Sequence, residues 1–173
     1  MKKAISLALA ALALAVVAAP ETQANEWGWR GDVYQRLSGH AIIVEDLDAA
    51  GNTTSTINGI AKGKRGSAQV TAVLVYESPS IFDDPRCPAE FPIGGNVFRF
   101  EWGETYNDGS LLAGYVPEVQ ALCTDGIETV ADLTGLISGG TGRFEGASGT
   151  WRIEASSPTA NTNTTGTITV ELE

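Results

Sequence analysis

The chain has 173 residues, with 21 acidic and 11 basic side chains and a formal net charge of −10. Such an acidic surface repels the phosphate backbone of nucleic acids and anionic lipid head groups, so neither is an expected partner. The length suits one domain with a single hydrophobic core, and no composition shift divides it.

The first 24 residues have the composition of a secretory signal peptide. Two lysines precede a run over residues 4–19 that is apolar apart from Ser6, and this run is shorter than the roughly 20 residues that span a bilayer. This length favours a cleaved signal over a membrane anchor. The small residues Thr22 and Ala24 favour cleavage after Ala24, and Val17 with Ala19 offers an earlier site.

We therefore expect an exported chain of residues 25–173, periplasmic or extracellular, with no membrane contact after cleavage. Its formal charge is −11, because two lysines and one glutamate leave with the signal. The two cysteines, Cys87 and Cys123, would meet an oxidising compartment, which favours a disulfide between them. A reactive thiol would need a nearby histidine or cationic cluster, and a metal site further ligands; the sequence around them offers neither.

The composition is typical of an all-β protein, because glycine, threonine and valine are abundant and lysine, glutamine and methionine are scarce. Without helices between them, neighbouring strands pair antiparallel. A closed eight-stranded barrel is favoured since it leaves no exposed edge, and a two-sheet β-sandwich is the alternative. Alternation and turn residues predict eight strands near residues 36–47, 54–63, 68–77, 96–104, 110–117, 128–139, 146–155 and 165–172.

Three connectors carry residues that favour tight turns. Asn-Asp-Gly at 107–109 predicts a hairpin between the fourth and fifth strands, and Ala-Gly-Asn at 50–52 joins the first to the second. Asp-Gly at 125–126 marks a third turn.

One connector differs from the others, since residues 78–95 hold four of the seven prolines together with Cys87. Such a segment cannot be a central strand. It is expected to be either a lid over the barrel mouth, tied to the 118–127 loop through Cys123, or a stiffened surface loop.

The fourth predicted strand carries the candidate ligand-binding residues. Alternation places Phe98, Phe100 and Trp102 on one face and Arg99 with Glu101 on the other. Because burying charge is costly, we expect the aromatic face inside the barrel and a surface ion pair outside. The opposite orientation would make the charged pair the best acid–base candidate.

The glycine-rich segment over residues 137–151 does not match a nucleotide-binding loop. A dinucleotide fingerprint would need glycine where Glu145 stands, and no lysine followed by serine or threonine completes a phosphate loop. The segment instead predicts a strand–turn–strand element with Gly142 at positive φ and Phe144 in the core.

The string Gly-Gly-Thr-Gly-Arg-Phe-Glu-Gly-Ala-Ser-Gly at 139–149 resembles a turn found in bacterial secreted proteins of the allene oxide cyclase barrel-like group. These proteins are related in shape to plant dirigent proteins. The resemblance covers residues 136–152, with a weaker echo at 166–168. It implies an eight-stranded antiparallel barrel, sometimes with a hydrophobic cavity for an isoprenoid-like, fatty or phenolic molecule. No catalytic residue of the group aligns with a position here.

No constellation of residues reaches the strength of a catalytic or metal motif. His40 is the single histidine, which rules out a histidine metal cluster, and residues 46–57 depart from a calcium loop at Ala50 and Ile57. We expect no metal and no cofactor, and the sequence carries no signal of an oligomeric state. Four more polar side chains are candidates if they point inward: Tyr76, Tyr115, Arg152 and Glu154.

The sequence thus favours an exported barrel that either binds a small hydrophobic molecule or serves as a non-catalytic structural module. The alternative is a cofactor-free cyclase or isomerase of the allene oxide cyclase barrel-like type.

Overall fold

The computed structural model describes residues 33–47, 51–63, 66–158 and 163–173, and within them the chain is all-β apart from one short 3-10 helix. The expected signal peptide, residues 1–24, lies outside this part. The elements are β1 (Val33–Leu47), β2 (Asn52–Gly63), β3 (Gly66–Glu77), β4 (Ile81–Phe82), β5 (Ile93–Tyr106), β6 (Leu111–Tyr115), β7 (Gln120–Thr124), β8 (Glu128–Thr141), η1 (Gly142–Phe144), β9 (Gly149–Pro158) and β10 (Asn163–Leu172).

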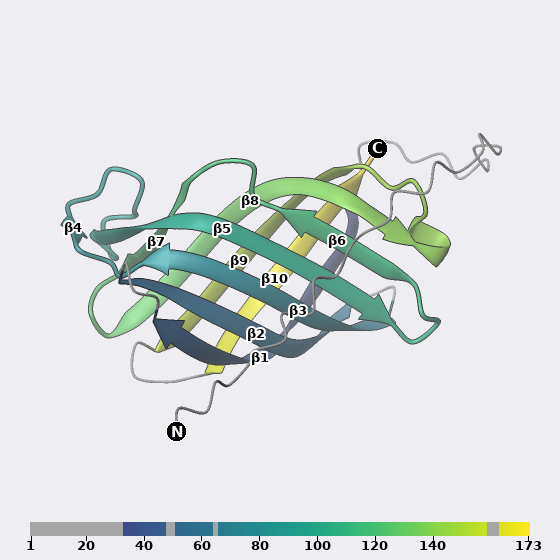
Figure 1. The fold of residues 1–173 in the computed structure, drawn as a ribbon, viewed down its shortest axis with the longest axis horizontal. Helices are drawn as coiled ribbons and strands as arrows, with labels where there is room; N and C mark the ends of the chain where they lie inside the picture. Colours follow the sequence, from purple (N-terminus) through teal and green to yellow (C-terminus); the bar gives the residue numbers. More distant parts are fainter. Residues whose placement is uncertain (1–32, 48–50, 64–65, 159–162) are drawn as a thin grey trace, which may run out of the picture.

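The strands close into an eight-stranded antiparallel barrel (Figure 1). The ring runs β1–β2–β3–β5–β6–β8–β9–β10, and β10 pairs with β1 to complete it. Beyond the end of β6, β7 takes the same place between β5 and β8, and β4 extends from β5 outside the ring. The closed barrel is therefore confirmed over the sandwich.

Every one of the eight predicted strands is present, and the glycines of the three predicted turns have positive φ. Gly51, Gly109 and Gly126 have φ of 86°, 81° and 91°, a region that glycine adopts without a steric penalty. The Asp125 carboxylate accepts hydrogen bonds from the backbone N–H groups of residues 127 and 128, each at 2.7 Å, which fixes the β7–β8 turn.

One half of the barrel interior is filled by aromatic side chains. The Trp151 ring lies 5.7 Å from that of Trp102 in an edge-on arrangement, and both side chains are buried. A Cβ at Gly114 would come within 2.5 Å of Trp151, and one at Gly135 would do the same. The two glycines therefore leave the space that Trp151 occupies. The buried core also includes Leu112, Ile137, Phe144, Val170 and Leu172, none of which lines the cavity described below.

The same half contains a buried carboxyl group. Glu104 is fully buried, and its Oε2 accepts a hydrogen bond from the hydroxyl of Tyr106. The Arg143 guanidinium lies 4.2 Å from the centroid of the Tyr106 ring and 3.2 Å from a carboxylate oxygen of Asp108. Arg143 thus covers this end of the barrel with its charge in solvent.

A β-bulge in β5 overturns part of the predicted face. The register between β3 and β5 shifts so that Val75 pairs with Arg99 and Tyr76 with Val97, which leaves Phe98 unpaired. Phe98 is 46% exposed, whereas Phe100 and Trp102 are 4% and 3% exposed. The expectation that all three aromatic residues share the inner face is therefore wrong for Phe98, since the extra residue interrupts the alternation.

The disulfide between Cys87 and Cys123 is confirmed, with 5.7 Å between the two Cα atoms. It joins the proline-rich segment to the barrel wall. Cys123 lies in β7, so the expectation of a loop over residues 118–127 is wrong for its middle part. Residues 120–124 pair with β5, and residues 122–124 pair with β8 as well.

Candidate functional site

The other half of the barrel holds a cavity of about 550 Å³. This volume lies within the range of small-molecule sites, roughly 300 to 1,000 Å³. The cavity opens at the end where β3 and β9 finish and β5 and β8 begin, because residues of the connecting segments there, Ser78, Pro79 and Gly126, are part of its lining. In Figure 1 this open end lies near β4 and β7, and the filled end lies near β6 and η1.

The walls of the cavity are mainly apolar and come from strands all round the ring. Alternation along each strand turns these side chains inward, and the small ones leave space that longer side chains would fill. The apolar lining includes Ala41, Ile43, Ile57, Val70, Ala72, Leu74, Phe100, Leu122, Ala131, Leu133, Ile153, Ala155 and Ile168.

Phe100 separates the cavity from the filled half. Its side chain lines the cavity, and its ring centroid lies 5.5 Å from that of Trp151 on the other side. Trp102 lies in the filled half beside Trp151 and is not among the described residues that line the cavity. Of the three predicted ligand-binding residues, only Phe100 therefore reaches the cavity.

A polar cluster lies at the mouth of the cavity, on three neighbouring strands. Glu45 of β1 is paired with Ser55 of β2, and Thr53 of β2 is paired with Tyr76 of β3. The Tyr76 hydroxyl donates a hydrogen bond of 2.9 Å to Glu45 Oε1, and Ser55 Oγ donates one of 3.4 Å to the same oxygen. All four residues line the cavity.

The surroundings of Tyr76 favour its neutral phenol. Burial raises the pKa of its hydroxyl above the ordinary value, and the hydrogen bond to the Glu45 carboxylate raises it further. Hydrogen bonds with Ser55 and Thr53 act in the opposite direction. Tyr76 therefore keeps its proton, and that proton is directed at Glu45.

The proline-rich segment borders the mouth only with its two ends. Ser78, Pro79 and Ile93 line the cavity, and the described residues between 80 and 92 do not. The segment is instead fixed to the outside of the barrel. Between the two predicted roles, lid or stiffened surface loop, this arrangement favours the surface loop.

An ion-pair network fixes this loop in addition to the disulfide. Arg86 Nε and Nη2 donate to the two carboxylate oxygens of Asp84 at 2.9 and 2.6 Å, and the Arg86 backbone N–H donates to Asp84 Oδ1 at 3.0 Å. These hydrogen bonds lower the pKa of Asp84 to about 2. Arg86 also donates to Asn96 on β5 at 3.0 Å, and Asn96 in turn donates to Glu77 at 2.9 Å.

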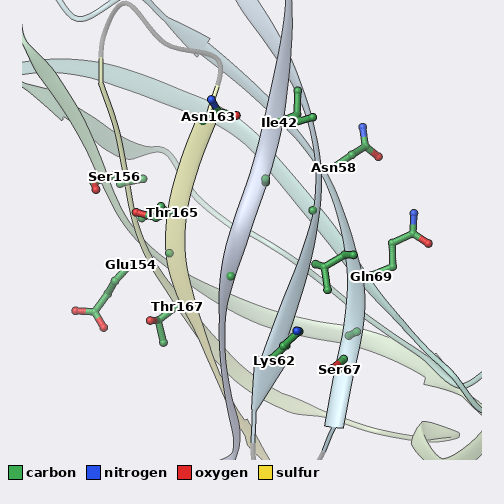
Figure 2. Close-up of a pocket in the computed structure, with 18 of the residues that line it drawn as sticks. Ile42, Asn58, Lys62, Ser67, Gln69, Glu154, Ser156, Asn163, Thr165 and Thr167 are labelled. Carbon is green, nitrogen blue, oxygen red and sulfur yellow. The ribbon is translucent and has the colours of Figure 1, made fainter.

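A second hollow has many exposed residues of β10, β1, β2 and β3 in its lining, together with residues of β5, β8, β9 and the proline-rich segment. Figure 2 shows its labelled side chains spread along β10, β1, β2, β3 and β9, with Asn163 at one end and Lys62 at the other. They do not converge on one point. This hollow lacks the enclosure of a small-molecule site, so the internal cavity is the better candidate.

The remaining sequence candidates lie outside the cavity. Arg99 and Glu101 form the expected surface ion pair, with 2.7 Å between Arg99 Nη2 and Glu101 Oε2 and both side chains exposed. Arg152 and Glu154 are exposed and lie 3.4 Å apart. Tyr115 is 38% exposed. The backbone of His40 belongs to β1, and its side chain is outside the described part of the structure.

Comparisons of the chain with protein-family models, with curated proteins and with solved structures found no match. Among the described residues, no helix has the length and apolarity needed to cross a membrane. The cavity and its polar mouth are therefore the observations on which a function can be argued.

Proposed function

We propose that this chain is an exported barrel protein that binds a small hydrophobic molecule in the internal cavity. The observation that carries the proposal is the contrast inside one barrel, where aromatic side chains fill one half and an apolar space of about 550 Å³ occupies the other. An apolar space in contact with solvent forfeits packing interactions, and a hydrophobic ligand restores them. A purely structural module would be more stable with both halves filled.

Export is supported by the disulfide, because such bonds persist in oxidising compartments. The resemblance to the allene oxide cyclase barrel-like group also stands as a proposal. It is consistent with a closed antiparallel barrel and a cavity, but the fold is shared by proteins of many functions.

A cofactor-free cyclase or isomerase is the second candidate, and the pairing of Glu45 with Tyr76 favours it. A carboxylate and a phenol are groups with which an enzyme removes a proton and returns it. Glu45 is exposed, however, and water at a reacting centre permits side reactions that enzymes of this kind exclude. Binding is therefore the function that the geometry supports best.

The test uses the oxidised chain of residues 25–173 and the neutral dye Nile red, whose fluorescence increases in apolar surroundings. We expect saturable binding and its displacement by isoprenoid, long-chain alkyl or aromatic compounds. The variant Ala41→Phe places a ring in the cavity and is expected to abolish binding. Its control is Ile42→Phe, the next residue of β1, whose side chain is 59% exposed.

Two results would contradict the proposal. One is the absence of saturable binding to the unaltered chain by every compound tested. The other is an equal loss of binding in Ala41→Phe and Ile42→Phe, since the dye would then bind outside the cavity. Product formation from a bound compound, lost in Glu45→Gln, would favour the second candidate.

A further inference from the structure

The lining of the cavity contains a single charge. Among the described residues that line it, Glu45 is the one with a formal charge at neutral pH, and the lining includes no lysine, arginine or described histidine. Glu45 lies near the end of β1, at the mouth, whereas the deeper lining around Phe100 is apolar. A ligand that fills the cavity would therefore have its apolar part against Phe100 and its other end beside Glu45.

The hydrogen bonds at the mouth decide which chemical groups the ligand can carry at the end that lies beside Glu45. The Tyr76 hydroxyl donates to Glu45 Oε1 at 2.9 Å, and Ser55 Oγ lies 3.4 Å from the same oxygen, which is long for a hydrogen bond between hydroxyl and carboxylate. Oε2 of Glu45 accepts no hydrogen bond from the described residues. The cluster therefore presents an anionic acceptor to the cavity, and the hydroxyl proton of Tyr76 is already engaged with it.

An incoming group must then supply the donor. A hydroxyl can donate to Glu45 Oε2, and an ammonium group can do so with the additional strength of a charge-assisted hydrogen bond. A carboxylate can do neither, because it has no proton to donate and would place a second negative charge beside the first.

The site holds its acceptor in a fixed place. Ser55 is 2% exposed, and its backbone is paired with Glu45 on one side and with Leu74 on the other. Tyr76, one strand further, reaches the same carboxylate oxygen. The hydrogen bond from Tyr76, with the longer contact from Ser55 beside it, orients the Glu45 carboxylate before any ligand arrives, which lowers the entropy cost of binding.

We propose that the cavity selects amphiphilic molecules whose polar end is a hydrogen-bond donor, an amine or an alcohol, and discriminates against carboxylates such as fatty acids. This inference rests on the proposed function and narrows its ligand class. Glu45 is the residue that sets the preference, and Tyr76 and Ser55 position its carboxylate.

Three compounds with one alkyl tail and different ends test the selection: decylamine, decan-1-ol and decanoate, titrated calorimetrically at pH 7.5 below their micellar concentrations. We expect decylamine to bind at least tenfold more tightly than decanoate, with decan-1-ol between them. In Glu45→Gln the amine is expected to lose about tenfold in affinity and decanoate to gain affinity, while the alcohol changes little.

Asp46→Asn is the matched control, because it removes the same charge from the next residue of β1, which is exposed and does not line the cavity. It is expected to leave the order of the three affinities unchanged. Equal binding of amine and carboxylate by the unaltered chain would overturn the inference, and so would equal effects of Glu45→Gln and Asp46→Asn. Failure of the proposed function is distinct, since none of the three compounds nor Nile red would then bind.

Discussion

The two halves of this barrel have the same backbone architecture and opposite interiors. At the filled end, Trp151 lies across the interior because Gly114 and Gly135 face it with no side chain. At the open end, the corresponding inward positions carry alanines and branched aliphatic residues, and a cavity of about 550 Å³ remains. Eight strands give a barrel just wide enough to be filled by side chains or to hold one small ligand. The comparison shows that side-chain volume, and not the strand number, decides between these outcomes.

Truncation of one large residue in each half gives the strongest test of this difference. Trp151→Ala is expected to reduce the free energy of unfolding by about 3 to 5 kcal/mol, because it removes the ring that contacts both Phe100 and Trp102. Leu74→Ala at the cavity wall should cost about 2 kcal/mol, since it enlarges an existing space. Urea unfolding measures both, and equal losses would contradict the distinction between a filled and a hollow half.

Removal of the disulfide tests whether the open end is stabilised by its outer loop. The bridge closes a segment with a sequence separation of 36 residues, so the double variant Cys87→Ser, Cys123→Ser is expected to lose about 2 to 4 kcal/mol of stability. The near-ultraviolet circular dichroism of the folded variant should retain the signals of Trp102 and Trp151, which lie in the other half. A changed tryptophan spectrum would show that the two halves are not independent.

A glycine at the filled end should give a smaller loss. Gly142 has a φ of 61°, and a Cβ there would come within 2.6 Å of Ser110 Oγ. Gly142→Val is expected to lower the free energy of unfolding by roughly 1 to 3 kcal/mol without changing ligand affinity. Gly146 has a φ of 75° but no atom within 4 Å of its Cβ position, so Gly146→Val should cost less. Equal losses of stability in Gly142→Val and Gly146→Val would contradict a role for the contact with Ser110 and would attribute both losses to backbone strain.

The smallest expected effect is a pH dependence at the open end. The pKa of Asp84 is about 2 in the folded protein, below the ordinary 3.8, because of its hydrogen bonds from Arg86. The resulting stabilisation is complete above about pH 5 and is lost progressively as the pH falls towards 2. The melting temperatures of the unaltered chain and Asp84→Asn, measured between pH 5 and pH 2, should therefore differ by an amount that shrinks as the pH falls. A constant difference would contradict the assignment.

The strands could be predicted from the sequence because each has a local signal. Alternation of side chains and turn glycines identified all eight strands of the ring, and the cysteine count indicated the disulfide. Strands β7 and β4 were missed because their residues lie in the segments 118–127 and 78–95, which the sequence predicts as loops.

The site is harder to predict from the sequence, because it depends on the register between strands and on the volume of the side chains that face inward. The bulge at Phe98 changes which residues face inward, and no signal in the sequence around it marks an inserted residue. Glu45 and Tyr76 are separated by 31 positions and meet only through the pairing of β1, β2 and β3. Tyr76 is a candidate by residue type, whereas no pattern in the sequence distinguishes Glu45 from the other acidic residues.

The pairing of β10 with β1 also determines when the ring can close during folding. Among the described strands, β10 comes last in the chain and pairs with β1, which comes first, so the ring closes through the contacts most distant in sequence. Until then β1 and β9 each present an unpaired edge that can recruit another chain. Thr164 and Ile168 of β10 belong to the cavity wall, so an unfinished chain has no enclosed cavity at all. Ligand added during synthesis would favour ring closure over edge-to-edge aggregation only after this final strand emerges.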